Sequence, residues 1–293
     1  MDIVLALDGS PSSLVARDLV ADRPWPEGTS IHLIAAYQLP IDWSGGLGPA
    51  EWIGEVDDAV RADMADQLDA AAAPLRERGL RVEQHVVAGR PATEIVAAAK
   101  ELGASLVVMG SRGRGPFRSM LLGSVAGEVT THAPCPVLVA RHPTVTRLVV
   151  ATDGSAGAEL IPDRLADLGA FAGVPADVVA VSIPDTPTFE LIVGLYTLGD
   201  ERLADRRREL RRRFGEAADR MVERLVAGGI PATGHVRTGD AAHEILALAR
   251  EREADLVVTG SRGLGALDRL LLGSVARNVL HHATASVLVV RHP

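Results

Sequence analysis

The sequence has 293 residues, of which 47% are hydrophobic and 23% charged, and its formal net charge is −8. This length allows two ordinary domains, and the composition is typical of a soluble globular protein. The acidic balance argues against a general nucleic-acid or membrane-surface binder. The opening "MDIVLALDGS" has too short an apolar run for a signal peptide, and no stretch approaches the roughly 20 apolar residues of a membrane span. We therefore expect a cytoplasmic protein.

Apolar runs of strand length alternate with longer amphipathic stretches along the chain. In the first half this pattern predicts strands near 2–8, 30–37, 80–87, 104–109 and 136–141, and helices near 11–22, 52–78, 91–102 and 121–132. In the second half it predicts strands near 147–152, 176–182, 231–237, 255–259 and 286–291, with a long charged helix near 199–227. Such alternation predicts an α/β fold, a parallel sheet with helices on both faces.

The two halves of the sequence repeat one another. Ser105–Pro143 aligns without a gap with Asp255–Pro293, and "IVLALDGS" near the start reappears as "LVVATDGS" ending at Ser155. A repeat of this kind predicts a duplicated domain, with one copy in residues 1–143 and the other in 144–293. Pro162 falls within the first helix of the second copy and predicts a shift or kink there.

Several scarce or isolated residue types exclude whole classes of chemistry. Cys135 is the single cysteine, so neither an internal disulfide nor a cysteine metal cluster can form. Lys100 is the one lysine, away from every glycine loop, so a Walker A phosphate loop is excluded. His281 and His282 are adjacent and point in different directions on a helix, so we expect no protein-bound metal. The basic run 206–213 is interleaved with acidic residues and predicts a solvated, salt-bridged helix face.

A glycine-rich loop follows the fourth expected strand of each half: "GSRGRGPFRSMLLGS" from Gly110 and "GSRGLGALDRLLLGS" from Gly260. Its glycines would let backbone N–H groups approach a ligand closely, or would adopt φ > 0 without strain. The helix that follows has free N–H groups and a positive dipole end, which favour phosphate. The alternative is a tight turn and a helix cap, with Ser124 as N-cap. The same spacing in both copies favours the phosphate site.

Charged residues accompany each loop. Asp8 and Asp153 end the first strand of each half, where they could cap a helix or accept hydrogen bonds from a nucleoside at the switch point of the sheet. Arg112 and Arg262 lie inside the loops and are the candidates for phosphate contact.

The loop pattern, Gly-x-x-Gly followed by nine residues and then Gly-Ser, resembles the ATP-binding signature of universal stress proteins. The resemblance covers essentially the whole chain as a tandem pair. It implies two Rossmann-like (HUP-type) domains of strand order 3-2-1-4-5, each with ATP across the ends of strands 1 and 4 and Mg²⁺ held through the phosphates. The ATP-binding residues it implies are Asp8, Ala36, Met109, Gly110, Arg112, Gly113, Gly123, Ser124 and Val125 in one half, and Asp153, Ser182, Thr259, Gly260, Arg262, Gly263, Gly273, Ser274 and Val275 in the other.

The same resemblance implies a nucleotide-dependent regulator of stress response or growth arrest. The sequence offers no dedicated catalytic base, and the open alternative is slow ATP hydrolysis or self-phosphorylation at Ser124 or Ser274. Thr259 replaces Met109 in the second copy, so equal affinity of the two sites also stays open. Family members commonly pair their last strands antiparallel. We expect the two halves to do so as a pseudo-dimer, with a homodimer and an unidentified protein partner as further assemblies.

Overall fold

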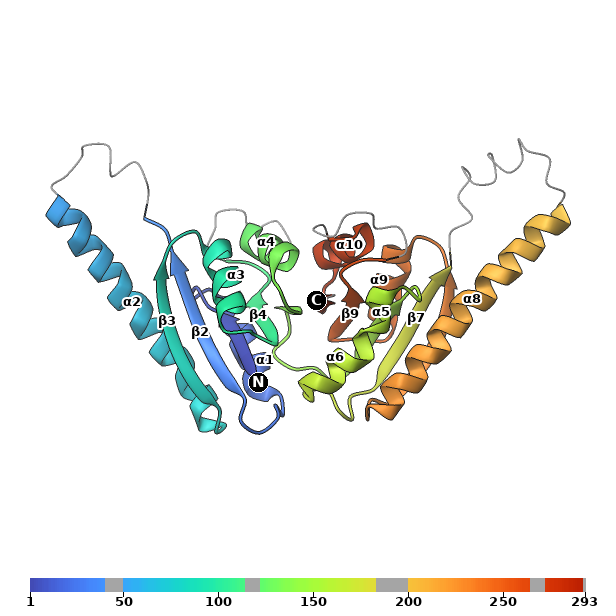
Figure 1. Cartoon of the computed structure of the whole chain (residues 1–293), viewed down its shortest axis with the longest axis horizontal. Helices are drawn as coiled ribbons and strands as arrows, with labels where there is room; N and C mark the ends of the chain where they lie inside the picture. The colour runs from blue at the N-terminus through green and yellow to red at the C-terminus, as the bar shows by residue number, and fades with distance from the viewer. Residues whose placement is uncertain (40–49, 114–121, 183–199, 264–271, 292–293) are drawn as a thin grey trace. The chain divides into compact units, whose positions relative to one another are not determined.

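A computed structural model describes residues 1–39, 50–113, 122–182, 200–263 and 272–291. The chain forms two compact units, Met1–Thr144 and Val145–His292. Each unit is an α/β domain with a parallel sheet and helices on both faces, which confirms the predicted fold class (Figure 1).

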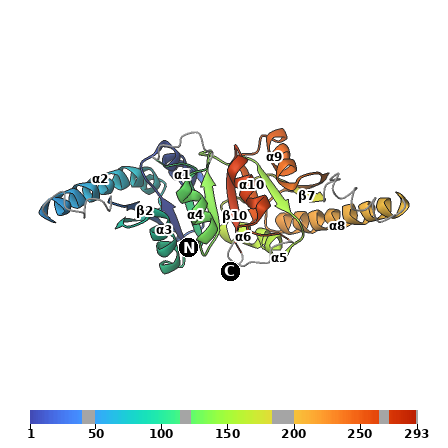
Figure 2. The ribbon, with the colours of Figure 1, turned by 90° about the horizontal axis from the view of Figure 1, so that it is seen from above.

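The first unit contains a five-stranded parallel sheet of order β3-β2-β1-β4-β5, the order 3-2-1-4-5. Helices α1 and α2 pack together on one face, and α3 and α4 pack together on the other. Figure 2 shows α1 and α3 on opposite sides of these strands. The elements are β1 (Asp2–Ala6), α1 (Pro11–Asp22), β2 (Ser30–Tyr37), α2 (Ala50–Glu77), β3 (Arg81–Ala88), α3 (Pro91–Glu101), β4 (Leu106–Gly110), α4 (Ser124–His132) and β5 (Val137–Ala140).

The second unit repeats this topology, with the parallel strand order β8-β7-β6-β9-β10. Helices α9 and α10 pack together on one face, while α6 and α8 pack together on the other. The elements are β6 (Leu148–Thr152), α5 (Ala156–Glu159), α6 (Ile161–Leu168), β7 (Ala176–Ser182), α8 (Asp200–Ala227), β8 (Ala232–Thr238), α9 (Ala241–Glu251), β9 (Leu256–Gly260), α10 (Ser274–His282) and β10 (Ser286–Val290).

Burial and capping explain why these segments form their elements. All five residues of β4 and all five of β9 are buried, as expected for central strands covered by helices on both faces. The Ser10 hydroxyl accepts a hydrogen bond of 3.2 Å from the Ser13 N–H and so caps α1, with Pro11 in its first turn. The Asp240 carboxylate caps α9 in the same way through the His243 N–H, at 2.9 Å.

The first helix differs between the two units. In the first unit α1 is continuous, but in the second it is replaced by the short α5 and by α6, which meet at Leu160. Pro162 lies in the first turn of α6. Because proline lacks an N–H and clashes with the carbonyl four residues earlier, it cannot continue α5. The predicted shift or kink is therefore confirmed as a break.

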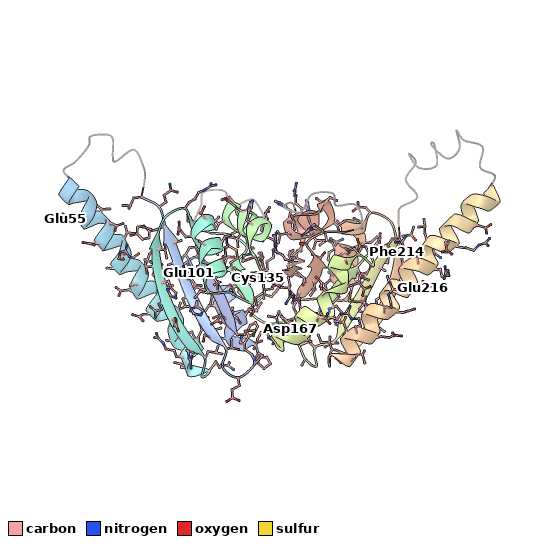
Figure 3. The ribbon with its side chains drawn as sticks, in the orientation of Figure 1. Glu55, Glu101, Cys135, Asp167, Phe214 and Glu216 are labelled. Carbon is pink, nitrogen blue, oxygen red and sulfur yellow. The ribbon has the colours of Figure 1, made fainter. Side chains whose placement is uncertain are left out.

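The long helix α8 has one buried face and one charged face. Phe214 is buried, whereas Glu216 is exposed (Figure 3). The Arg212 guanidinium donates to Glu209 at 2.7 Å and to Glu216 at 2.6 Å, so the solvated, salt-bridged face is confirmed for these residues. Among the helices that the structure describes, none is both long and apolar enough to cross a membrane.

Candidate functional site

A pocket of about 310 Å³ opens in the second unit at the carboxyl ends of β6, β7 and β9. This volume reaches the range of about 300–1,000 Å³ that is usual for small-molecule sites. Its walls also include the first turns of α9 and α10. The lining residues are Ala151, Thr152, Asp153, Ala158, Val179, Val181, Ala241, Ile245, Thr259, Gly260, Arg262, Gly263, Gly273, Ser274, Val275 and Ala276.

In both units the second loop glycine lies directly against the aspartate that follows the first strand. A Cβ atom built on Gly263 would lie 2.5 Å from Asp153 Oδ2, and one on Gly113 would lie 2.6 Å from Asp8 Oδ2. Neither glycine has a positive φ. Close approach, rather than an unusual backbone conformation, therefore favours glycine at these two positions, because a Cβ would have to push the end of the carboxylate aside.

The first loop glycine contacts backbone instead. A Cβ on Gly110 would lie 2.5 Å from the backbone carbon of Ser12, at the start of α1. The corresponding contact of Gly260, to the backbone of Gly157, is looser at 3.3 Å. Because backbone cannot move aside as a side chain can, Gly110 sets how closely β4 packs against α1.

Glycines begin the helix after each loop. The N-cap residues of α4 and α10 are Gly123 and Gly273, and neither helix start has a side-chain cap. Ser124 and Ser274 are the first helical residues, so the alternative that Ser124 is the N-cap is wrong. The Gly123 N–H donates to the Ser111 carbonyl at 2.8 Å, and Gly273 repeats this bond with Ser261. The following N–H groups point out of the helix end, which is the arrangement that favours an anion.

The first loop is held to α1 by serine side chains. The Ser12 hydroxyl accepts a 3.2 Å bond from the Arg112 N–H and lies 3.3 Å from the Ser111 hydroxyl. The Ser10 hydroxyl donates to the Arg112 carbonyl at 3.2 Å. Gly157 takes the place of Ser12 in the second unit, so the second loop cannot form the two contacts that the Ser12 hydroxyl makes in the first. The two sites therefore differ in how their loops are anchored.

Two positively charged side chains, Arg112 and Arg141, lie near the first loop. Burial, and next the positive charge of Arg112, lower the pKa of the Arg141 guanidinium from its usual value to about 10. Two guanidinium groups near one loop repel each other, and an anion bound beside them would reduce that repulsion.

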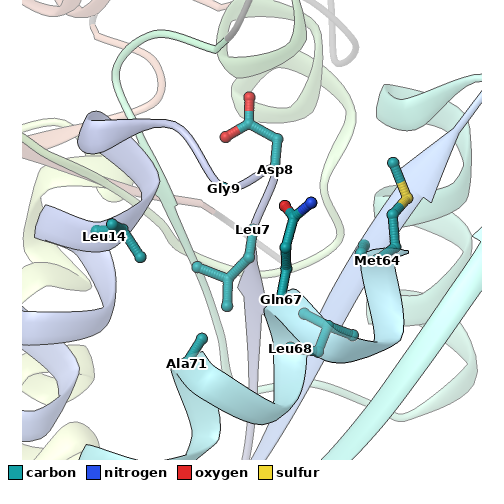
Figure 4. A pocket seen from close by; sticks show the side chains of 9 residues that line it. Leu7, Asp8, Gly9, Leu14, Met64, Gln67, Leu68 and Ala71 are labelled. Atoms are coloured by element: carbon teal, nitrogen blue, oxygen red, sulfur yellow. The ribbon is translucent and has the colours of Figure 1, made fainter. Parts of the chain in front are cut away.

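The first unit also contains a small hollow of about 20 Å³ between the end of β1 and α2 (Figure 4). A space of this size is enough for about one water molecule and not for a nucleotide. Its lining residues are Leu7, Asp8, Gly9, Leu14, Ala35, Met64, Gln67, Leu68 and Ala71. Asp8 therefore borders both this hollow and the glycine loop.

The structure brings most of the implied residues of the second half into one pocket. Ser182 is not among the lining residues, whereas Val179 and Val181 are. Alternate strand residues point to opposite faces, and the pairing of β6 with β7 makes Val181 the counterpart of Ala36. The choice of Ser182 as the equivalent of Ala36 is therefore corrected by one residue.

Eight lining residues of the pocket were missed by sequence reasoning, among them Ala241 and Ile245. Both lie in the first turns of α9, within "GDAAHEILALAREREA". This segment repeats "GRPATEIVAAAKELGA" of the first half, and that repeat was the available signal.

Two consecutive α/β units, each with a glycine loop against a strand-end aspartate, define a tandem α/β protein with a ligand-sized pocket at the carboxyl edge of the second sheet. The model of the universal stress protein family matches residues 1–141 and again 144–291. The chain therefore belongs to the universal stress protein family, with two family domains in tandem.

Known proteins agree with this assignment over the whole length. Universal stress protein Mb2028c of Mycobacterium bovis is 30% identical over 305 residues, covering 99% of this chain and 96% of the relative. Universal stress protein YxiE of Bacillus subtilis is 31% identical over 144 residues, covering 47% of this chain and 97% of the relative. A universal stress protein structure from Archaeoglobus fulgidus has a TM-score of 0.67 at 23% identity, with 99% of this chain and 96% of that chain covered, and supports the fold.

Proposed function

We propose that the protein binds ATP, one molecule in each half, and acts as a nucleotide-dependent regulator of stress response or growth arrest. The observation that carries the proposal is the pocket of about 310 Å³ in which Asp153, the glycine loop and the uncapped start of α10 converge. The same proposal places the protein in the cytoplasm, where ATP is available.

Each part of the pocket fits a different part of a nucleotide. Asp153 Oδ1 accepts a bond from the Ser155 N–H at 2.9 Å, which fixes the carboxylate where ribose hydroxyls could donate to it. Val179 and Val181 offer an apolar wall for a base. Arg262 and the first N–H groups of α10 supply the positive end for phosphates. Mg²⁺, when bound, would neutralise phosphate charge and would be held through the phosphate oxygens.

The residues that line the pocket favour a regulatory function over a catalytic one. Among the residues that line the described pocket, Asp153 supplies the one carboxylate, and its Oδ1 is already engaged by the Ser155 N–H. A site without a second acid or a lysine has few means to activate a nucleophile. Nucleotide occupancy would instead favour one conformation or partner surface over another.

The test is direct. The full-length protein is purified, denatured, and the released nucleotide identified by chromatography; the nucleotide-free protein is then titrated with ATP in the presence of Mg²⁺. We expect ATP or ADP in the released fraction and two sites per chain. No released nucleotide together with no binding on titration would refute the proposal. Phosphate release and radiolabel transfer from γ-labelled ATP test the alternative of slow hydrolysis or self-phosphorylation at Ser124 or Ser274.

Assembly through the last strand of each half, as an intramolecular pseudo-dimer, stays a prediction. Light scattering after size exclusion measures the molar mass and so distinguishes the pseudo-dimer from a homodimer. A chain whose halves pair with each other would have the mass of a monomer. A homodimer would double the measured mass.

A further inference from the structure

A second cluster of titratable side chains lies at the amino ends of the strands in the first unit, whereas the glycine loop lies at their carboxyl ends. His32 of β2 is placed between Asp2 of β1 and two residues of β3, Glu83 and His85. The His32 side chain is only 5% exposed, whereas that of Glu83 is 53% exposed. The cluster therefore has a buried base and a side open to solvent.

The distances in this cluster match a metal site. His32 Nδ1 lies 3.4 Å from His85 Nε2 and 3.5 Å from Glu83 Oε2, and the three ligand atoms all lie within 4.8 Å of one another. In a tetrahedral zinc site, metal–ligand bonds of about 2.0–2.2 Å place neighbouring ligand atoms about 3.3–3.5 Å apart. The two shorter separations therefore already have the length of tetrahedral edges.

The other ring nitrogen of His32 has the partner that metal-binding histidines usually have. Asp2 Oδ1 lies 3.0 Å from His32 Nε2. When Nε2 donates its hydrogen to that carboxylate, Nδ1 keeps its lone pair and faces Glu83 Oε2 and His85 Nε2. A carboxylate behind the histidine orients the ring and strengthens it as a ligand. In the tautomer of His85 that has no hydrogen on Nε2, three lone pairs converge on one point, which is the arrangement that a metal ion binds.

The second unit fills the same position without needing an external cation. Strand pairing makes Asp177 the counterpart of His32. The Asp177 carboxylate, 6% exposed, is 3.2 Å from Arg147, 3.3 Å from Arg252 and 2.8 Å from His235. Arginine thus supplies the positive charge within the second unit.

The first unit has other residues where those arginines stand. Asp2 corresponds to Arg147, and Leu102 corresponds to Arg252. Glu83 adds a carboxylate where the second unit has Thr233. The two halves therefore carry opposite charge patterns around one equivalent buried position.

We propose that His32, His85 and Glu83 bind a zinc-class divalent transition-metal ion, with Asp2 orienting His32. Two imidazoles and one carboxylate suit zinc and its neighbours rather than Mg²⁺ or Ca²⁺, which prefer oxygen ligands. The solvent-facing side of Glu83 leaves the fourth position for water. The ion would join β3, the edge strand of the first sheet, to its neighbour β2.

The experiment uses the untagged full-length protein after removal of metals with a chelator. Titration with Co²⁺ is followed by visible absorption, because tetrahedral cobalt gives intense d–d bands, and titration with Zn²⁺ is followed by calorimetry. We expect one tightly bound ion per chain, tetrahedral cobalt bands, and a higher Tm with Zn²⁺. Binding should weaken at least tenfold in Glu83→Gln and in His85→Asn, and about 10–100-fold in Asp2→Asn.

His235→Asn is the matched control, because His235 holds the position in the second unit that His85 holds in the first. It should leave metal stoichiometry and cobalt bands unchanged, and circular dichroism checks that each variant folds. Absence of binding to the wild-type protein would overturn the proposal. Binding that survives both Glu83→Gln and His85→Asn would overturn it as well.

Discussion

Gly113 packs so closely against Asp8 that a single added methyl group would lie 2.6 Å from Oδ2 of the carboxylate, and Gly263 repeats the contact with Asp153 at 2.5 Å. The loop and the aspartate side chain therefore pack against each other at the carboxyl ends of the strands in each unit. Gly113 and Gly263 leave room for the carboxylate, which a side chain at either position would crowd. This pairing leads to a specific prediction for the second half.

Gly263→Ala should weaken nucleotide binding in the second half by about tenfold or more, or about 1.4 kcal/mol. The added Cβ must displace either the loop or the Asp153 carboxylate, and both line the pocket. Calorimetric titration with ATP should then resolve one strong and one weak site. Gly54→Ala is the control, because a Cβ on Gly54 meets open space. Two unchanged sites in Gly263→Ala would contradict this prediction.

Ser12→Ala should loosen the first loop without unfolding the domain. It removes the hydroxyl that accepts the Arg112 N–H bond, and a bond of this kind contributes about 1 kcal/mol. Hydrogen exchange of the segment 110–113 should accelerate about fivefold, as local opening becomes easier. Ser105→Ala, with an exposed side chain, should not change it. An unaltered exchange rate in Ser12→Ala would show that the hydroxyl does not anchor the loop.

Much of the fold could be predicted from the sequence because its signals are local. Apolar runs indicated the strands. Because the two halves repeat one another, the elements predicted in one half could be checked against those predicted in the other. The helix break at Pro162 also followed from a local rule, since proline cannot continue a helix.

What could not be predicted depends on neighbours that are distant in sequence. Whether Val181 or Ser182 faces the pocket depends on strand register. The close approach of Gly113 to Asp8 is set by how two loops pack. In the sequence, His32 is an isolated histidine in the mostly apolar strand "SIHLIAAY", and only the pairing of β1, β2 and β3 brings Asp2, Glu83 and His85 beside it.

Asp177→Asn should destabilise the second unit by about 1.5–3 kcal/mol, because a buried carboxylate loses its charge-assisted bonds. Arg147→Gln should cost less than about 1 kcal/mol, since the Arg147 side chain is 41% exposed and water replaces its partner. Urea unfolding followed by circular dichroism measures both changes. Equal effects of the two substitutions would argue against the central place of Asp177 in this cluster.

The ion pair between Glu251 and Arg237 should make a pH-dependent contribution to stability. Arg237 donates to both carboxylate oxygens of Glu251, with Nη1–Oε1 at 3.0 Å, and these hydrogen bonds are the main cause that lowers the pKa of Glu251 below its ordinary value. A carboxyl whose folded pKa is depressed stabilises the fold above its unfolded pKa. That contribution is lost as the pH falls through the folded pKa.

Glu251→Gln should therefore lower the Tm slightly near neutral pH and have no effect well below the ordinary pKa of glutamate. The shift should be small because the Glu251 side chain is 55% exposed. Glu101→Gln is the matched control: Glu101 holds the equivalent position on α3, and Val87 stands on β3 where Arg237 stands on β8. Thermal unfolding of the wild-type protein and the two variants, measured from neutral pH to well below the ordinary pKa of glutamate, checks the prediction. A Tm difference for Glu251→Gln that persists at low pH would mean that packing, rather than the ion pair, is what the glutamate contributes.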